Sequence, residues 1–148
     1  MDTQTYLKPI PAGDIKKGMF VLLNDKTCKI VELHHAKTGK HGHMKVSLTG
    51  LCIFTQSKYL HICAGHQTLY QVEVLRKDNQ VVAIYDDIIE LLTADNEIER
   101  LETKDMELID LKELSELYKK DESLILLTLT TAVENNEVVK KATGFKTI

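Results

Sequence analysis

The sequence predicts a mainly β protein made of two small barrels, the second of which carries one helix. Its 148 residues suffice for one ordinary domain or for two small domains with thin cores. In the first half, short apolar segments alternate with single glycines, as strands joined by tight turns do. In the second half, strand-like segments flank one amphipathic helical segment. Together with a change in charge, these patterns divide the chain near residue 75.

The first half is expected to contain an N-terminal arm and an antiparallel barrel. Both prolines of the chain, Pro9 and Pro11, fall within residues 1–11, and this predicts an extended arm. The barrel is predicted over residues 12–75, with polar and apolar side chains alternating as in half-buried strands. Its clearest strands are expected over residues 19–23, 28–33 and 44–49.

The second half, residues 76–148, predicts a five-stranded oligonucleotide/oligosaccharide-binding (OB) barrel with one helix. Asp110 can cap that helix, and Glu113 stands three residues later, where a capping-box partner is found. Apolar residues then follow at helical spacing, at Leu111, Leu114, Leu117 and Tyr118. Strands are expected over residues 81–85, 88–92 and 125–130.

Composition excludes several classes of protein. Hydrophobic residues at 43% and charged residues at 28% are values of a folded globular chain rather than a disordered one. No segment approaches the roughly 18 consecutive apolar residues of a membrane span, so we expect a cytoplasmic protein with no membrane partner. The three cysteines, Cys28, Cys52 and Cys63, form no C-x-x-C pair, which predicts buried free thiols rather than a disulfide framework.

Charge is distributed unevenly along the chain. Residues 1–75 hold nine lysines against five acidic residues (+4), whereas residues 76–148 hold ten basic and seventeen acidic residues (−7). Residues 33–72 contain no Asp or Glu but contain all six histidines. A cationic surface on an otherwise acidic protein predicts an anionic partner such as an RNA backbone.

The segment most informative about function is residues 34–45, which holds four histidines and three lysines between two apolar strands. Gly39 and Gly42 allow a tight reversal of the chain, which would leave Lys40 and His41 at the tip of a hairpin. A lysine in that position is a long cation suited to entering a partner's cleft.

Three known motifs share features with this loop. Gly39-Lys40 is not a phosphate-binding P-loop, since no glycine stands five residues earlier and His41 replaces the magnesium-binding Ser or Thr. Residues 39–42 match the GxxG loop of KH domains, but their flanks look like strands rather than helices. Zinc binding would need the loop histidines to converge without a nearby Cys or carboxylate. Those histidines are His34, His35, His41 and His43.

Residues 37–43, Lys-Thr-Gly-Lys-His-Gly-His, resemble the modification loop of the hypusine-containing translation initiation/elongation factor 5A family. The resemblance covers about residues 10–148 and is weaker in the second half. It implies an N-terminal SH3-like barrel followed by a C-terminal OB-fold barrel. Beyond the loop it is carried by residues 28–32, 45–50, 53–55, 58–59 and 125–128.

By this resemblance, Lys40 is the residue converted to hypusine. Deoxyhypusine synthase would transfer a four-carbon amine from spermidine, and deoxyhypusine hydroxylase would add a hydroxyl group. The chain is then a substrate of these enzymes, not an enzyme, and holds no bound cofactor and no metal. Lys37, Thr38, His41 and His43 would orient the modified arm toward RNA, while Gly39 and Gly42 set the turn. The implied partners are the ribosome and peptidyl-tRNA, and the implied activity is peptide-bond formation at stalled sequences such as consecutive prolines, with assistance to termination.

The sequence departs from the family pattern at several positions and leaves alternatives open. Met44 stands where the family has Ala, Ala64 stands where Pro is common, and residues 34–36 replace a Ser/Thr-rich lead-in. None of these removes Lys40. One alternative is an unmodified two-barrel module for single-stranded RNA, which the absence of Trp makes less favourable for base stacking. A zinc-stabilised interaction protein is a second alternative, and homodimer formation is left open.

Overall fold

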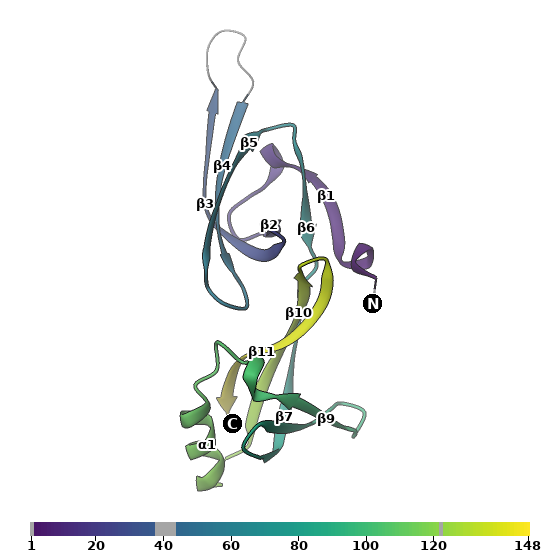
Figure 1. The fold of residues 1–148 in the computed structure, drawn as a ribbon, viewed down its shortest axis with the longest axis vertical. Coiled ribbons are helices and arrows are strands. Elements are labelled where there is room, and N and C mark those ends of the chain that lie inside the picture. Colours follow the sequence, from purple (N-terminus) through teal and green to yellow (C-terminus); the bar gives the residue numbers. More distant parts are fainter. Residues whose placement is uncertain (1, 38–43, 122) are drawn as a thin grey trace. The chain divides into compact units, whose positions relative to one another are not determined.

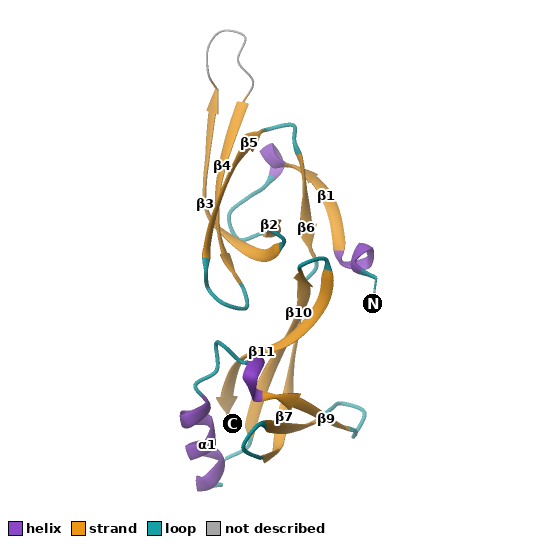
Figure 2. Ribbon diagram, in the orientation of Figure 1, coloured by secondary structure: helices purple, strands orange, loops and turns teal. Residues whose placement is uncertain are grey.

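The structure is a computed structural model that describes residues 2–37, 44–121 and 123–148. The chain divides into two compact units, residues 1–74 with 132–139 and residues 75–131 with 140–148. Strands make up most of each unit, and α1 (Leu111–Lys120) is the α-helix that the described residues contain (Figures 1 and 2). Within these residues no helix is long and apolar enough to span a membrane.

The first unit is a curled antiparallel sheet in which the strand order is β1-β6-β2-β3-β4-β5. Its strands are β1 (Leu7–Pro11), β2 (Phe20–Leu23), β3 (Lys26–Lys37), β4 (Met44–Cys52), β5 (Lys58–Ala64) and β6 (Thr68–Val72). Two short 3-10 turns, η1 (Thr3–Tyr6) and η2 (Ala12–Asp14), precede and follow β1. Asn24 and Asp25, with φ of 52° and 60°, form the tight turn between β2 and β3.

The N-terminal arm is a paired strand of this sheet rather than a segment outside it. β1 pairs with β6 from Leu7 opposite Val72 to Pro11 opposite Thr68. Two prolines are tolerated there because β1 is an edge strand, where a missing N–H can face away from the neighbouring strand. A barrel that begins at residue 12 therefore leaves out one of its strands.

The second unit has five strands and a helix, as a five-stranded barrel requires, and the sequence located three of these strands and the helix. Its strands pair in the order β9-β8-β7-β10-β11. They are β7 (Leu75–Ile84), β8 (Ile88–Leu92), β9 (Ile98–Glu102), β10 (Ile125–Glu134) and β11 (Glu137–Thr147), with η3 (Thr103–Asp105) after β9.

The predicted helix cap is confirmed. The Asp110 carboxylate accepts a hydrogen bond from the Glu113 backbone N–H at 3.1 Å. Lys119 and Lys120 occupy the last turn, where cations suit the helix dipole. The helix ends at Asp121, which has the left-handed φ of 49°.

The tip of the β10–β11 hairpin belongs to the first unit, although most of the hairpin belongs to the second. The buried Thr27 hydroxyl donates to the Val133 carbonyl at 2.7 Å and accepts from the Val133 N–H at 3.2 Å. Lys26 adds a hydrogen bond to Asn135 and an ion pair with Glu134. A domain boundary at residues 75/76 does not describe this arrangement, because contacts between residues more than 100 positions apart hold the tip in place.

Each unit has its own apolar core. Ile15, Ile30 and Leu48 are among the fully buried side chains of the first, and Leu114 of α1 is buried among Ile89, Leu91 and Leu127 in the second. The three cysteines are free and buried in the first core, as predicted. Burial, and secondarily the neighbouring Cys52, raises the pKa of the Cys28 thiol to about 12.

Candidate functional site

The candidate site lies at the end of the hairpin that β3 and β4 form. The two strands pair antiparallel from Cys28 opposite Cys52 to Lys37 opposite Met44, with one irregularity between Ile30 and Glu32. Figure 1 shows them side by side as a long hairpin. The strands predicted on both sides of the loop are therefore confirmed. Because a KH-type GxxG loop connects helices, these strands exclude that interpretation.

Most of the predicted site residues lie outside the described residues. They are Thr38, Gly39, Lys40, His41, Gly42 and His43. Lys37 is described, and it is the exposed last residue of β3. The structure therefore fixes the two ends of the loop, Lys37 and Met44, which face each other as the last pair of the ladder.

Met44 anchors its end of the loop to the body of the first unit. Its carbonyl accepts a hydrogen bond from the Gly65 N–H at 2.8 Å, and the Gly65 carbonyl accepts one from the Gly13 N–H at 2.8 Å. This relay joins three segments that are far apart in the sequence. It holds the first residue of β4 in one position relative to β5 and η2.

Two glycines make room for the Met44 side chain. A Cβ atom added at either Gly13 or Gly65 would lie 2.7 Å from the Met44 terminal methyl. Gly13, Asp14, Met44, Gly65 and His66 also line a shallow pocket of about 340 Å³. No sequence signal marks Gly13 and Gly65 for this role, because only their contact with residue 44 distinguishes them from ordinary turn glycines.

The described part of this hairpin end is cationic. Lys37 and Lys45 are exposed, and neither lies within 4.0 Å of a carboxylate of the described residues. His34 contacts Glu32 at 3.0 Å on the exposed face of β3. The described part of the hairpin end thus carries exposed cations on paired strands, which suits binding and positioning of an anion.

The structure does not bring together a metal site among the described residues, where no group of three potential ligands converges. The zinc hypothesis also depends on His41 and His43, which lie outside those residues, so it stays a prediction.

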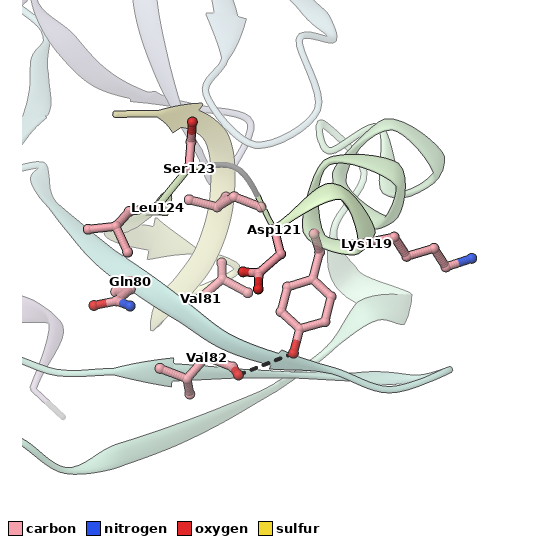
Figure 3. Close-up of a pocket in the computed structure, with 9 residues that line it drawn as sticks. Gln80, Val81, Val82, Lys119, Asp121, Ser123 and Leu124 are labelled. Atoms are coloured by element: carbon pink, nitrogen blue, oxygen red, sulfur yellow. Dashed lines mark hydrogen bonds between the residues drawn. The ribbon is translucent and has the colours of Figure 1, made fainter.

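A second hollow lies in the second unit, beside the end of α1. It has a volume of about 450 Å³ and is lined by residues of β7, α1 and the segment after α1 (Figure 3). The Tyr118 hydroxyl donates to the Val82 carbonyl at 3.3 Å across its floor. Lys119 points away from the hollow, while Asp121 turns toward Val81. Because its one lysine faces outward, this hollow suits an anionic ligand less well than the hairpin end does.

Comparison with known proteins supports the resemblance. Residues 4–67 match the family model described as "Translation initiation factor 5A-like, N-terminal". Eukaryotic translation initiation factor 5A from Drosophila melanogaster is 43% identical over 79 residues, which is 53% of this chain and 50% of that protein. Eukaryotic translation initiation factor 5A-2 from Caenorhabditis elegans is 29% identical over 133 residues, 88% of this chain and 81% of that protein.

The solved structure of a translation initiation factor eif-5a family protein from Naegleria fowleri superposes with a TM-score of 0.78 at 28% identity. The match covers 95% of this chain and 99% of that one. The chain spans about half the length of the first curated relatives that it matches.

The fold and the structural match define a mainly β protein with an N-terminal SH3-like barrel and a C-terminal OB-fold barrel. The described residues of the second barrel contain one α-helix. The predicted fold class is confirmed. The chain is similar to translation initiation factor 5A proteins, in its first half to the family model and over 95% of its length to the solved structure.

Proposed function

We propose that this chain binds the ribosome next to peptidyl-tRNA and promotes peptide-bond formation at stalled sequences, such as consecutive prolines, and termination. The proposal depends on hypusine formed on Lys40. One observation carries it: the seven-residue sequence Lys-Thr-Gly-Lys-His-Gly-His begins at the last residue of β3 and ends immediately before β4, within the matched region 4–67.

Hypusine formation would lengthen the cation of Lys40, which lies in the sequence between β3 and β4. About five added bonds near 1.5 Å extend the Lys40 side chain by roughly 6 Å. The new amine and hydroxyl groups can contact RNA phosphate or 2′-hydroxyl groups. Such contacts would hold peptidyl-tRNA in a productive geometry and lower an entropic barrier without an acid or base from the factor.

In this proposal the chain is the substrate of deoxyhypusine synthase and deoxyhypusine hydroxylase, with spermidine as the source of the added group. The contacts of Met44 support its compatibility with modification. Its carbonyl is bound to Gly65, and its terminal methyl lies against Gly13 and Gly65. The side chain that replaces the family's Ala is thus accommodated by the body of the barrel.

The proposal is tested by the Lys40→Arg variant in a translation assay on a message with consecutive prolines. Arginine keeps the charge but lacks the primary amine that accepts the aminobutyl group. We expect Lys40→Arg to lose rescue, while the matched control Lys45→Arg, on the exposed face of β4, keeps it. Peptide mass spectrometry of native material should place an aminobutyl group plus one oxygen on Lys40. Full rescue by Lys40→Arg, or unmodified Lys40 in cells with both enzymes active, would contradict the proposal.

The alternative function is that of an unmodified single-stranded RNA-binding module. Lys37 and Lys45 favour it, since no carboxylate of the described residues lies within 4.0 Å of either and both would meet phosphates whatever the state of Lys40. For three or four lysine–phosphate contacts the slope of log K against log salt should be about −2 to −3. Tight binding of arbitrary RNA that ignores the modification would favour this alternative, whereas ribosome binding that falls without it would favour the translation factor.

A further inference from the structure

The edge strand β5 carries hydrogen-bonding groups that no described residue uses. β5 pairs only with β4 among the described strands. The hydrogen bonds from the Gly65 N–H to the Met44 carbonyl and from the Cys52 N–H to the Ser57 carbonyl fix which residues bond across this ladder. Since bonded pairs alternate in an antiparallel ladder, Tyr59, His61 and Cys63 bond to β4. Leu60 and Ile62 therefore direct their backbone N–H and C=O groups to the open side.

The same two residues expose large apolar side chains. Leu60 is 63% exposed and Ile62 is 61% exposed. Successive side chains of a strand alternate between its faces, so Leu60 and Ile62 lie next to each other on one face, with Lys58 continuing the row. An apolar row beside free backbone groups is a template for the addition of a further strand.

Two other edge strands, β1 and β9, are protected against the addition of a strand. β1 contains Pro9 and Pro11, which cannot donate to an added strand. In β9 the one exposed apolar residue, Ile98, is followed on the exposed face by charged side chains. One of these, Arg100, forms an ion pair with Glu90 at 2.9 Å. β5 has a single charged residue, Lys58, at its first position.

Charge defines the kind of partner that fits. Residues 33–72 contain no carboxylate, and Lys58 lies within 4.0 Å of none among the described residues. Glu32 of β3 lies in the same cross-strand row as Leu60, but its carboxylate already contacts the His34 ring. A second copy of β5 would bring another Lys58 and no carboxylate, so it would leave this charge unmatched.

We propose that β5 binds an extended acidic–apolar peptide of another protein as an added antiparallel strand. Alternate residues of that peptide would be apolar opposite Ile62, apolar opposite Leu60 and acidic opposite Lys58. Backbone hydrogen bonds supply the affinity, and these three positions supply the specificity. The site is independent of Lys40 and goes beyond the proposed function in translation.

The test uses the unmodified full chain and a fluorescein-labelled, end-blocked peptide, Thr-Val-Thr-Val-Thr-Glu-Thr. In the proposed register its two valines face Ile62 and Leu60 and its glutamate faces Lys58, and these three residues bond to β5, whereas the intervening threonines do not. N-methylation of both valines should weaken binding about tenfold or more in fluorescence anisotropy, whereas N-methylation of the two threonines that follow them should change it less than about twofold. Replacing the glutamate by lysine should weaken binding several-fold, because it places two cations opposite each other.

The matched protein variants are Leu60→Lys and Ile98→Lys, since both replace an exposed apolar residue of an edge strand. Leu60→Lys should weaken binding about tenfold or more, while Ile98→Lys should leave it unchanged. Circular dichroism checks that both variants are folded. Absence of binding at millimolar peptide, equal effects of the two N-methylated peptides, or equal effects of the two variants would overturn the proposal. If the chain forms a dimer in place of the peptide complex and Leu60→Lys disrupts that dimer, β5 binds a second copy. If it binds oligouridine in place of the peptide and Leu60→Lys abolishes that binding, β5 binds RNA. Either result would overturn the proposal. Translational rescue measured with modified protein is a separate readout, so either proposal can fail alone.

Discussion

Thr27→Val should destabilise the protein by removing two buried hydrogen bonds at nearly constant side-chain volume. Thr27 is fully buried, and its hydroxyl both donates to the Val133 carbonyl and accepts from the Val133 N–H. Val133 is itself only 1% exposed, so neither of its groups can turn to water. An unsatisfied buried group costs about 1–3 kcal/mol, and valine avoids part of the desolvation cost of the hydroxyl. The expected net loss is about 2–4 kcal/mol.

Urea unfolding followed by far-ultraviolet circular dichroism measures this loss. With a slope of about 2 kcal/mol/M, the midpoint should fall by about 1–2 M. Hydrogen exchange of the Val133 amide should accelerate, because its acceptor is gone. Thr27→Ser is the matched control: it keeps the hydroxyl and loses one methyl group, at a cost of about 1 kcal/mol. A larger loss in Thr27→Ser than in Thr27→Val would show that methyl packing, and not the hydrogen bonds, holds the hairpin tip.

Three further predictions concern packing, thiol reactivity and pH. Gly50→Ala should cost about 1–3 kcal/mol in urea unfolding, since the new Cβ would lie 2.8 Å from the Cys28 Cβ; Gly144→Ala, with no atom within 4 Å, should cost nothing, and equal effects would refute the steric argument. Cys28, with its pKa raised to about 12 by burial and by Cys52, should resist iodoacetamide at pH 8 until urea unfolds the chain, and rapid native alkylation would contradict its burial. Hydrogen bonds from Thr128 and Lys146 lower the pKa of the Asp78 carboxyl below its ordinary 3.8, so its contribution to stability is present above that value and lost as pH falls through the native pKa; Asp78→Asn should flatten this acid dependence, and an unchanged profile would count against it.

Local patterns predicted the elements that local interactions determine. The alternation of polar and apolar residues from Met44 predicted β4, and Asp110 with Glu113 predicted the start of α1. β7 begins at Leu75 rather than at residue 81, because its first four residues are exposed and mostly polar and give no apolar pattern. β9, which is also rich in charged residues, was missed for a similar reason.

Contacts between distant residues could not be predicted in this way. The bonds of Thr27 to Val133 hold a hairpin tip from the end of the sequence on a sheet built from its beginning. The contact of Met44 with Gly13 and Gly65 likewise depends on three segments meeting. Neither partner carries a local signal, since a threonine in a strand and a glycine after a strand have many other roles. The loop itself was identified by its specific sequence, which needs no such contact.

The two halves differ in net charge and also in which of their charged residues form ion pairs. In the second unit, several acidic residues form ion pairs within the unit: Glu90 pairs with Arg100, Asp78 with Lys146 and Glu99 with Lys140. In the first unit, Lys37, Lys45 and Lys58 have no carboxylate within 4.0 Å among the described residues. A charge already compensated within its own unit gains less from an external ion than an uncompensated one does. Lys37, Lys45 and Lys58 therefore gain more from an external anion than the paired cations of the second unit do, while the excess negative charge of the second unit disfavours indiscriminate binding of nucleic acid.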